Sequence, residues 1–288
     1  MRGEQSFNLI TPRELENLQT QTHVHIVDAR PLSEFEKRHV LNAICIEWES
    51  FCAPAPISAP DILKRPGWWG KLEAVEERSF NQTLFACGLN DTTPIVFYAD
   101  GMHSKGRDGR LAWMFLYLGA RQVFLLDGGI DALLAAGFET TSGRAVPTRA
   151  PFTMRVKDER RLTLSELKGK FDESKLPISI DTRTAKEFEG EEFHYQPRLG
   201  RIPGSINLNF DALYREDKTF IGRDEFLAML PLSVAPEFTY CEVGVRASTF
   251  ALLYELYVGK ILPVYDGSFM EWSLEPALPV KTGPQQTP

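Results

Sequence analysis

Short apolar runs alternate with helix-like segments along both halves of the chain. The runs that predict buried strands are residues 24–27, 95–98 and 122–126 in the first half and 178–180, 238–240 and 261–265 in the second. Strands that alternate with amphipathic helices are typical of an α/β domain with a largely parallel sheet. The pattern therefore predicts an α/β domain in each half.

Two helix starts have the same polar signature. Thr11 is predicted to cap a helix, with Pro12 at its first position and Glu14 at its third. Thr163 and Glu166 have the same spacing in the second half. Each half is therefore expected to open with a capped helix.

The two halves also repeat each other in sequence. The segment Asp28-Ala29-Arg30 reappears as Asp181-Thr182-Arg183, and Glu34-Phe35 reappears at the same offset as Glu187-Phe188. Residues 94–98 pair in the same way with residues 236–240. We infer that the chain arose by duplication of one domain.

Domain boundaries follow from this repeat. We expect a first domain over residues 5–140, a linker over 141–151, a second domain over 152–282 and a disordered tail over 283–288. The linker is rich in Thr, Pro, Gly and Ala and has no periodicity.

Charge and hydropathy restrict the class of partner. The 288 residues carry a formal net charge of −7 and have no run of Lys or Arg, which argues against nucleic-acid or anionic-membrane binding. No apolar stretch approaches the roughly 18 residues of a transmembrane helix, and residues 1–15 lack a signal-peptide core. The sequence predicts a cytoplasmic protein with no membrane partner.

The four cysteines are Cys45, Cys52, Cys87 and Cys241. Their spacing matches neither a disulfide framework nor a zinc site, so free thiols and no metal are expected.

Cys241 stands out among them because of its surroundings. It follows the predicted strand 238–240 and precedes a segment in which Phe250, Leu253 and Tyr257 have helical spacing. Backbone N–H groups at a helix start stabilise an anion, so this thiol is expected to ionise near neutral pH and act as a nucleophile. A buried cysteine is more often a small hydrophobe, but Gly244 and Arg246 in the same loop favour chemistry.

With these motifs the chain resembles the tandem rhodanese-domain sulfurtransferases, the family of thiosulfate and 3-mercaptopyruvate sulfurtransferases. The resemblance covers nearly the whole chain and is carried by residues 28–30, 181–183, 201–208, 241–246 and 265–272. It implies two rhodanese-like domains, each a mostly parallel central sheet flanked by helices. It also places the catalytic cysteine at Cys241, while Ala99 takes the matching position in a non-catalytic first domain.

The resemblance implies a mechanism without a metal or organic cofactor. Cys241 would take the outer sulfur of a small anionic donor, thiosulfate first and 3-mercaptopyruvate second. The resulting persulfide would pass that sulfur to a thiophilic acceptor such as cyanide or a thiol. The residues expected to bind substrate around it are Glu242, Val243, Gly244, Val245, Arg246 and Arg198.

Three charged positions have further expected roles. Arg246 is placed either to hold the anionic donor or to pair with Glu242. Asp181 and Arg183 are expected to form a structural ion pair beside the site, because the first domain keeps the same pair without an active cysteine. Both named subfamilies have an arginine where this chain has Glu187, and Arg198 matches a second substrate-facing arginine of the mercaptopyruvate enzymes.

The Cys241 loop allows two alternative interpretations. Cysteine phosphatases resemble C-x-x-x-x-x-R, whereas the spacing from Cys241 to Arg246 is one residue shorter, and Tyr240 stands where phosphatases tend to have His. A persulfide-carrying or regulatory binding module is the other alternative. It is disfavoured because the second domain retains its thiol.

Overall fold

The computed structural model describes residues 6–172, 177–192, 195–231 and 235–285. The chain forms two compact units. Unit 1 contains residues 6–50, 74–157 and 214–220, and unit 2 contains residues 51–73 together with the described residues of 158–213 and 221–285. The units therefore interleave along the sequence. Residues 51–73 of the first half belong to unit 2, and residues 214–220 of the second half belong to unit 1.

Unit 1 is built on a five-stranded sheet in the order β1-β6-β5-β2-β4, in which all neighbours are parallel. Its strands are β1 (Phe7–Ile10), β2 (His25–Asp28), β4 (Ile44–Cys45), β5 (Ile95–Tyr98) and β6 (Val123–Leu126). Two further short strands, β3 (His39–Val40) and β7 (Thr140–Thr141), pair antiparallel.

Unit 2 repeats this sheet. Its strands are β8 (Arg161–Leu162), β9 (Ser179–Asp181), β10 (Ser205–Asn207), β11 (Phe238–Tyr240) and β12 (Val264–Tyr265). They are parallel and follow the order β10-β9-β11-β12-β8, which is the order of unit 1 read from the other edge. The predicted fold class, two α/β domains with parallel sheets, is confirmed.

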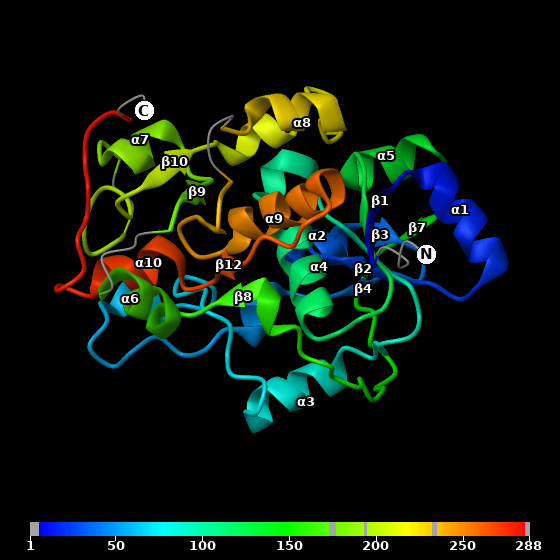
Figure 1. The fold of residues 1–288 in the computed structure, drawn as a ribbon. Coiled ribbons are helices and arrows are strands. Elements are labelled where there is room, and N and C mark those ends of the chain that lie inside the picture. The colour runs from blue at the N-terminus through cyan, green and yellow to red at the C-terminus, as the bar shows by residue number, and fades with distance from the viewer. Residues whose placement is uncertain (1–5, 173–176, 193–194, 232–234, 286–288) are drawn as a thin grey trace. The chain divides into compact units, whose positions relative to one another are not determined.

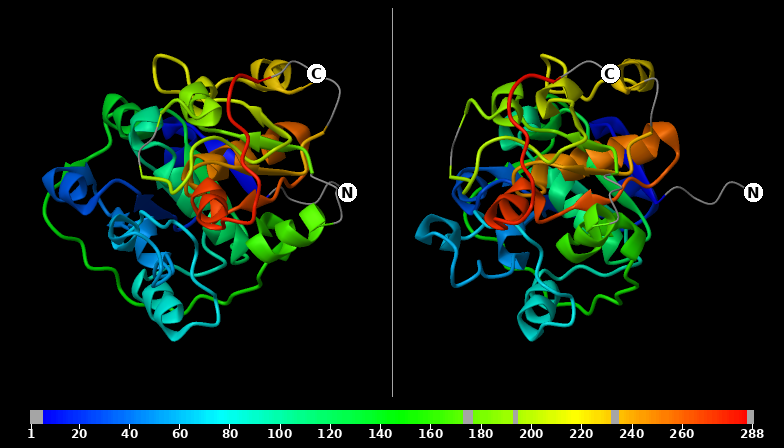
Figure 2. Two further views of the ribbon diagram at one scale, coloured as in Figure 1. Left: turned by 90° about the vertical axis from the view of Figure 1, so that its left-hand side faces the viewer. Right: turned by 60° about the vertical axis from the view of Figure 1, so that its left-hand side comes forward.

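Helices flank both sheets (Figure 1). Unit 1 has α1 (Pro12–Gln21), α2 (Leu32–Lys37), α3 (Arg78–Ala86), α4 (Arg107–Tyr117) and α5 (Gly129–Ala135). Unit 2 has α6 (Leu164–Asp172), α7 (Ala185–Glu189), α8 (Arg223–Met229), α9 (Val245–Val258) and α10 (Ser268–Leu274). Helix α9, drawn in orange in Figure 1 and seen from two further sides in Figure 2, packs on β11 and against α8. Within the described ranges, no helix combines the length and apolar character needed to cross a bilayer.

Both predicted helix starts are present. The Thr11 side chain accepts a hydrogen bond from the Glu14 N–H at 3.3 Å, and the Glu14 carboxylate accepts one from the Thr11 N–H at 2.9 Å. Thr163 and Glu166 form the same reciprocal pair at 3.4 and 2.7 Å. A third capping box, between Thr184 and Glu187, begins α7 and was not expected from the sequence.

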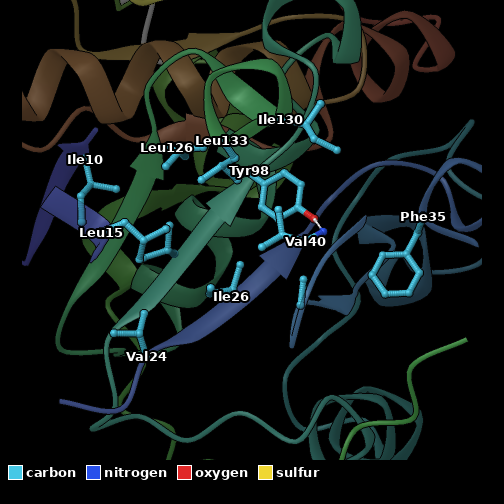
Figure 3. Packing of buried hydrophobic residues seen from close by; sticks show 12 residues of the cluster. Ile10, Leu15, Val24, Ile26, Phe35, Val40, Tyr98, Leu126, Ile130 and Leu133 are labelled. Carbon is cyan, nitrogen blue, oxygen red and sulfur yellow. Dashed lines mark hydrogen bonds between the residues drawn. The ribbon is translucent and has the colours of Figure 1, made fainter. Parts of the chain in front are cut away.

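The hydrophobic core of each unit contains a buried tyrosine at the matching position. In unit 1, Tyr98 lies among side chains from β2, β6 and α1, and its hydroxyl accepts a hydrogen bond from the Val40 N–H at 3.3 Å (Figure 3). In unit 2, the Tyr240 hydroxyl accepts one from the Ile202 N–H at 3.2 Å. Because Tyr240 directly precedes Cys241, this bond fixes the strand end from which the candidate loop departs.

A buried ion pair is repeated as well. The Arg30 guanidinium lies 2.6 Å from the Asp28 carboxylate, and Arg183 lies 2.6 Å from Asp181. Each arginine also donates to a main-chain carbonyl in the following loop, of Arg38 at 2.7 Å or of Gly200 at 2.8 Å. Because both units have the contact, it favours the structural role expected for Asp181 and Arg183.

The chain end differs in part from the expectation. Residues 283–285 were predicted to belong to a disordered tail, but the Gly283 carbonyl accepts a hydrogen bond from Arg201 at 2.6 Å and the Gln285 side chain accepts one from the Asn207 N–H at 2.9 Å. These two hydrogen bonds hold the segment on unit 2. Residues 286–288 lie outside the described residues.

Replacing Asp181 by Asn should destabilise the protein by about 3–5 kcal/mol, because the buried Arg183 guanidinium would lose its charge partner. Urea unfolding of the purified variant measures this loss. The control is Glu34→Gln, which breaks an exposed ion pair with Lys37 and should have no measurable effect. Equal stability of the Asp181 variant and the parent would contradict a structural role for the pair.

Candidate active site

Cys241 lies in a tight turn between β11 and α9. The N-cap of α9 is Gly244, only three residues on, with φ 83° in the left-handed region that favours glycine. Its N–H donates a hydrogen bond to the Cys241 sulfur at 3.1 Å, and Cys241 is 1% exposed. The strand, loop and helix predicted around Cys241 are therefore present. The sulfur lies at the Gly244 N–H and at the N-terminus of the 14-residue helix α9, which is the positive end of the helix dipole.

The start of α10 anchors this turn. The Ser268 hydroxyl accepts a hydrogen bond from the Cys241 N–H at 3.2 Å and donates one to the Tyr265 carbonyl at 2.8 Å. The Phe269 N–H donates to the Cys241 carbonyl at 3.0 Å, and the Met270 N–H donates to the Glu242 carbonyl at 2.9 Å. In the sequence, residues 265–272 stood out only as carriers of the family resemblance, and their role as the support of the turn was not predicted.

Arg246 is held by Glu187. Two guanidinium nitrogens lie 2.8 Å from the two Glu187 carboxylate oxygens, whereas the nearest Glu242 oxygen is 3.9 Å away. The sequence offered a donor contact or a pair with Glu242 as the role of Arg246. Its main partner is instead Glu187, because the capping box at the start of α7 presents that carboxylate to the loop.

This pair stays charged at neutral pH. Burial disfavours the charge of Glu187, but the hydrogen bonds and charge of Arg246 outweigh burial and lower the pKa of Glu187 to about 2. Burial likewise opposes the charge of Arg246, and its bonds to Glu187 reverse that effect and raise the pKa of the guanidinium. The Arg246 guanidinium is therefore held by the Glu187 carboxylate, which belongs to the same unit.

Glu242 contacts residues that precede β10 in the chain. The Gln196 side-chain amide donates a short hydrogen bond to its carboxylate. Burial first, and then the negative charge of Glu242, raises the pKa of Tyr195. The Tyr195 ring packs on the Trp68 indole with a centroid distance of 4.3 Å. Glu242 thus follows Cys241 directly in the chain, and its carboxylate interacts with the Gln196 amide and the Tyr195 side chain.

A strap from the first half of the chain, residues 68–72, contacts the loop within unit 2. Gly70 has φ 70°, and a Cβ built on it would lie 2.3 Å from the Cβ of Val243. Lys71 pairs with Glu271 at 2.6 Å, and the Leu72 N–H donates to Asp266 at 2.8 Å. The strap therefore fixes Val243 from outside, a role that its sequence did not reveal.

The remaining predicted binding residues differ in their placement. Val243 and Val245 are buried at 8% and 7% exposure, so they shape the loop by packing. Arg198 donates to four main-chain carbonyls at and beyond the end of α10, those of Trp272, Ser273, Glu275 and Leu278. This contact set favours a structural role for Arg198 over the substrate contact that was expected, because its donors already satisfy helix-end carbonyls.

The matching position of unit 1 carries no thiol. The Ala99 carbonyl accepts a hydrogen bond from the Ile130 N–H at 2.8 Å, as the Cys241 carbonyl does from Phe269. The next helix there, α4, has its N-cap at Gly106, seven residues on instead of three. Lys218 lies over this longer turn and binds Asp100 at 2.6 Å. Unit 1 therefore has the same backbone hydrogen bond at this position as unit 2, but it has alanine in place of the cysteine.

Two of the other thiols, Cys45 and Cys87, have surroundings that oppose ionisation. None of the four cysteines is in a disulfide. Burial raises the pKa of Cys45 and of Cys87 to about 12 each, so neither is ionised near neutral pH. Among the described residues, no group of three or more His, Cys, Asp or Glu side chains is arranged to hold a metal ion.

Comparison with known proteins gives matches over both halves. A family model described as a rhodanese-like domain matches residues 11–136 and 163–275. The chain is 30% identical over 225 residues to a thiosulfate sulfurtransferase of Corynebacterium glutamicum, covering 73% of each chain. It is 28% identical to a probable 3-mercaptopyruvate sulfurtransferase of Pseudomonas aeruginosa, over 96% of this chain and 99% of that one.

Solved structures show the same fold. The anaerobic ergothioneine biosynthesis enzyme of Chlorobium limicola, in complex with trimethyl histidine, superposes with a TM-score of 0.79 at 20% identity, covering 96% of this chain and 70% of that one. The crystal structure of YnjE superposes with a TM-score of 0.77 at 22% identity, covering 96% and 68%. At these identities the likeness concerns the fold alone.

Gly70→Ala should destabilise unit 2 by about 1–3 kcal/mol more than Gly259→Ala, because the added methyl meets Val243. Gly259 is a matched control, since it has a similar φ of 78° and nothing within 4 Å of its built Cβ. Both variants bear the same backbone cost. Urea unfolding compares them, and equal losses would show that the strap does not press on the loop.

The Glu187–Arg246 pair should stabilise the fold above pH 4.5, where unfolded Glu187 is ionised, and lose this effect as pH falls towards the folded pKa of about 2. Relative to Glu187→Gln, the parent should therefore be more stable by about 3 kcal/mol at pH 7 and gain progressively less below pH 4.5. Unfolding free energies measured from pH 7 to pH 2 test this. A difference that does not change with pH would contradict the ion pair.

Proposed function

The chain belongs to the rhodanese-like domain family and is a sulfurtransferase of that type, and on this premise we propose that it works through a persulfide on Cys241. The sulfur comes from a small anionic donor and goes to a thiophilic acceptor such as cyanide or a thiol. The observation that carries the proposal is the 3.1 Å hydrogen bond from the Gly244 N–H to the Cys241 sulfur at the start of α9. It stabilises a thiolate, the nucleophilic form of cysteine.

The first half-reaction loads the enzyme. The Cys241 thiolate attacks the outer sulfur of the donor, and the bond from that sulfur to the rest of the donor breaks with both electrons leaving on the departing group. Thiosulfate would release sulfite, and 3-mercaptopyruvate would release pyruvate after protonation of its enolate. The Gly244 N–H and the helix start then stabilise the negative terminal sulfur of the persulfide.

The second half-reaction regenerates the thiolate. The acceptor attacks the outer sulfur of the persulfide, the S–S bond breaks, and the electron pair returns to the Cys241 sulfur. Cyanide would leave as thiocyanate, and a thiolate would leave as a persulfide. No step requires a metal or an organic cofactor. In each half-reaction a neutral sulfur atom passes from the leaving group to the attacking nucleophile, and the electron pair of the broken bond stays with the leaving group.

Two donors fit this scheme. Thiosulfate is the donor that the sequence predicts first, with 3-mercaptopyruvate second, and relatives of this chain carry both names. The two differ in charge, because thiosulfate is a dianion and 3-mercaptopyruvate a monoanion near neutral pH. Rates with both donors measured side by side discriminate between them.

A phosphatase-like reaction is the second candidate, and the loop opposes it. Arg246 follows Cys241 one residue earlier than in the phosphatase spacing, and its guanidinium is bound to Glu187 at both nitrogens. A phosphate would have to displace that carboxylate. The persulfide-carrying or regulatory module remains a weaker candidate, in which Cys241 would load sulfur without turnover.

We further propose residues 5–140 as the non-catalytic domain, 141–151 as the linker and 152–282 as the catalytic domain. The two family matches fall inside these two domains. A cytoplasmic location, and the lack of a nucleic-acid or membrane partner, stay predictions from the sequence.

Replacing Cys241 by Ser should abolish sulfur transfer from thiosulfate or 3-mercaptopyruvate to cyanide, because a serine hydroxyl neither ionises near neutral pH nor carries a sulfane sulfur. The matched control replaces Cys45, Cys52 and Cys87 together by Ser and should keep most of the activity. Thiocyanate formation measures both. Turnover by the Cys241 variant at the parental rate would move the active site elsewhere.

A further inference from the structure

Glu242, the residue directly after Cys241, is held from two sides within unit 2. Its main-chain carbonyl accepts a hydrogen bond from the Met270 N–H at 2.9 Å. Its carboxylate accepts hydrogen bonds from the Gln196 amide and from the Tyr195 hydroxyl. The Glu242 side chain is only 14% exposed, so these bonds form where water is largely excluded. The residue after the nucleophile is therefore oriented by its side chain as well as by its main chain.

Tyr195 connects Glu242 to the strap of residues 68–72. Its ring packs on the Trp68 indole at a centroid distance of 4.3 Å. Further along the strap, Gly70 packs against Val243, which follows Glu242 in the chain. The strap and the loop are thus joined twice, once through Tyr195 and once through Gly70. Two links restrain the relative motion of two segments more than one does, because the first link brings the partners of the second together.

The Tyr195 hydroxyl is a hydrogen-bond donor at neutral pH. Burial first, and then the negative charge of Glu242, raises the pKa of Tyr195, so the hydroxyl keeps its proton. A negative charge on the Cys241 sulfur acts on this pKa in the same direction. Hydrogen bonds to an ionised acceptor are roughly twice as strong as neutral ones. The bond from Tyr195 to the Glu242 carboxylate is therefore a strong restraint close to the nucleophile.

We propose that Tyr195 is a positioning residue for the sulfur transfer at Cys241. Its hydroxyl holds Glu242 and its ring holds the strap, so that the turn keeps the geometry in which the Gly244 N–H meets the sulfur. On loading, the negative charge moves from the Cys241 sulfur to the added sulfur, about 2 Å away along the new S–S bond. A turn that is already rigid needs little rearrangement to receive that charge. This inference rests on the proposed sulfur transfer at Cys241.

The rate of sulfur loading in a single turnover tests this role. The full chain is mixed with an excess of thiosulfate or 3-mercaptopyruvate, whichever loads the parent faster, and without an acceptor. Samples quenched at intervals are weighed by intact-mass spectrometry, which gives the fraction of chains that carry one added sulfur. The dependence on donor concentration separates the loading rate constant at saturation from the donor concentration that gives half of it.

Tyr195→Phe keeps the ring and removes the hydroxyl. It should lower the saturating rate constant about tenfold, the scale of one lost hydrogen bond to a charged group. The half-saturating donor concentration should stay the same, because the hydroxyl binds the loop and not the donor. Loading by Tyr195→Phe at the parental rate overturns this inference and leaves the proposed function intact.

Tyr257→Phe is the matched control. It also removes one tyrosine hydroxyl, which donates to the Ile221 carbonyl at 2.9 Å from the last turn of α9, at the end of the helix far from Cys241. This variant should load sulfur at the parental rate. If Tyr257→Phe slows loading as much as Tyr195→Phe does, the effect is a general loss of structure and the positioning role is wrong.

A double variant shows whether Tyr195 acts through Glu242. In a Glu242→Ala background, Tyr195→Phe should slow loading by less than about twofold more, because the hydroxyl no longer has that carboxylate to hold. The same tenfold loss in both backgrounds overturns positioning through Glu242. Trp68→Leu should slow loading about threefold through the lost ring contact, whereas Trp68→Phe keeps an aromatic partner and should load like the parent.

The outcomes separate this inference from the proposed function. A parent chain that takes up no sulfur from either donor overturns both. If Glu242→Ala fails to fold, Tyr195→Phe and Tyr257→Phe decide the question by themselves, since each removes a single oxygen atom and keeps its ring.

Discussion

The short turn between β11 and α9 is the constraint on which the site depends. Only three residues separate Cys241 from the helix N-cap, so the chain must reverse through Gly244 at φ 83°, and its N–H then meets the sulfur at 3.1 Å. Unit 1 shows what a longer turn does. There the N-cap of α4 is seven residues beyond Ala99, and alanine stands at the position of Cys241. The two units therefore share the frame of the site and differ in the residue at its centre and in the length of the turn that follows.

Each support of that turn comes from a different part of unit 2. Ser268 at the start of α10 holds the Cys241 N–H, Gly70 in the strap lets the chain approach Val243, and Glu187 on α7 holds Arg246. None of these contacts touches the sulfur itself. Their shared effect is a rigid loop, which lowers the reorganisation needed when charge moves onto the persulfide.

The sequence was informative wherever a local pattern determines the structure. The six predicted strands, the capping boxes at Thr11 and Thr163 and the repeat of the two units depend on neighbouring residues. All are present, although the strand predicted over residues 261–265 is limited to Val264–Tyr265. Contacts between distant segments were not predictable in this way. The pairing of Arg246 with Glu187 spans 59 residues, and the contacts of Arg198 with α10 span more than 70. An arginine has the same local signature whether it meets a substrate, a carboxylate or a helix end.

The most direct test of the central claim is the intact mass of the protein after exposure to thiosulfate or 3-mercaptopyruvate without an acceptor. The account predicts that one sulfur atom is added per chain, that the peptide containing Cys241 carries it, and that cyanide removes it. Sulfur found on Cys45, Cys52 or Cys87 with Cys241 unmodified would contradict the account. So would turnover to thiocyanate without any sulfur-loaded protein.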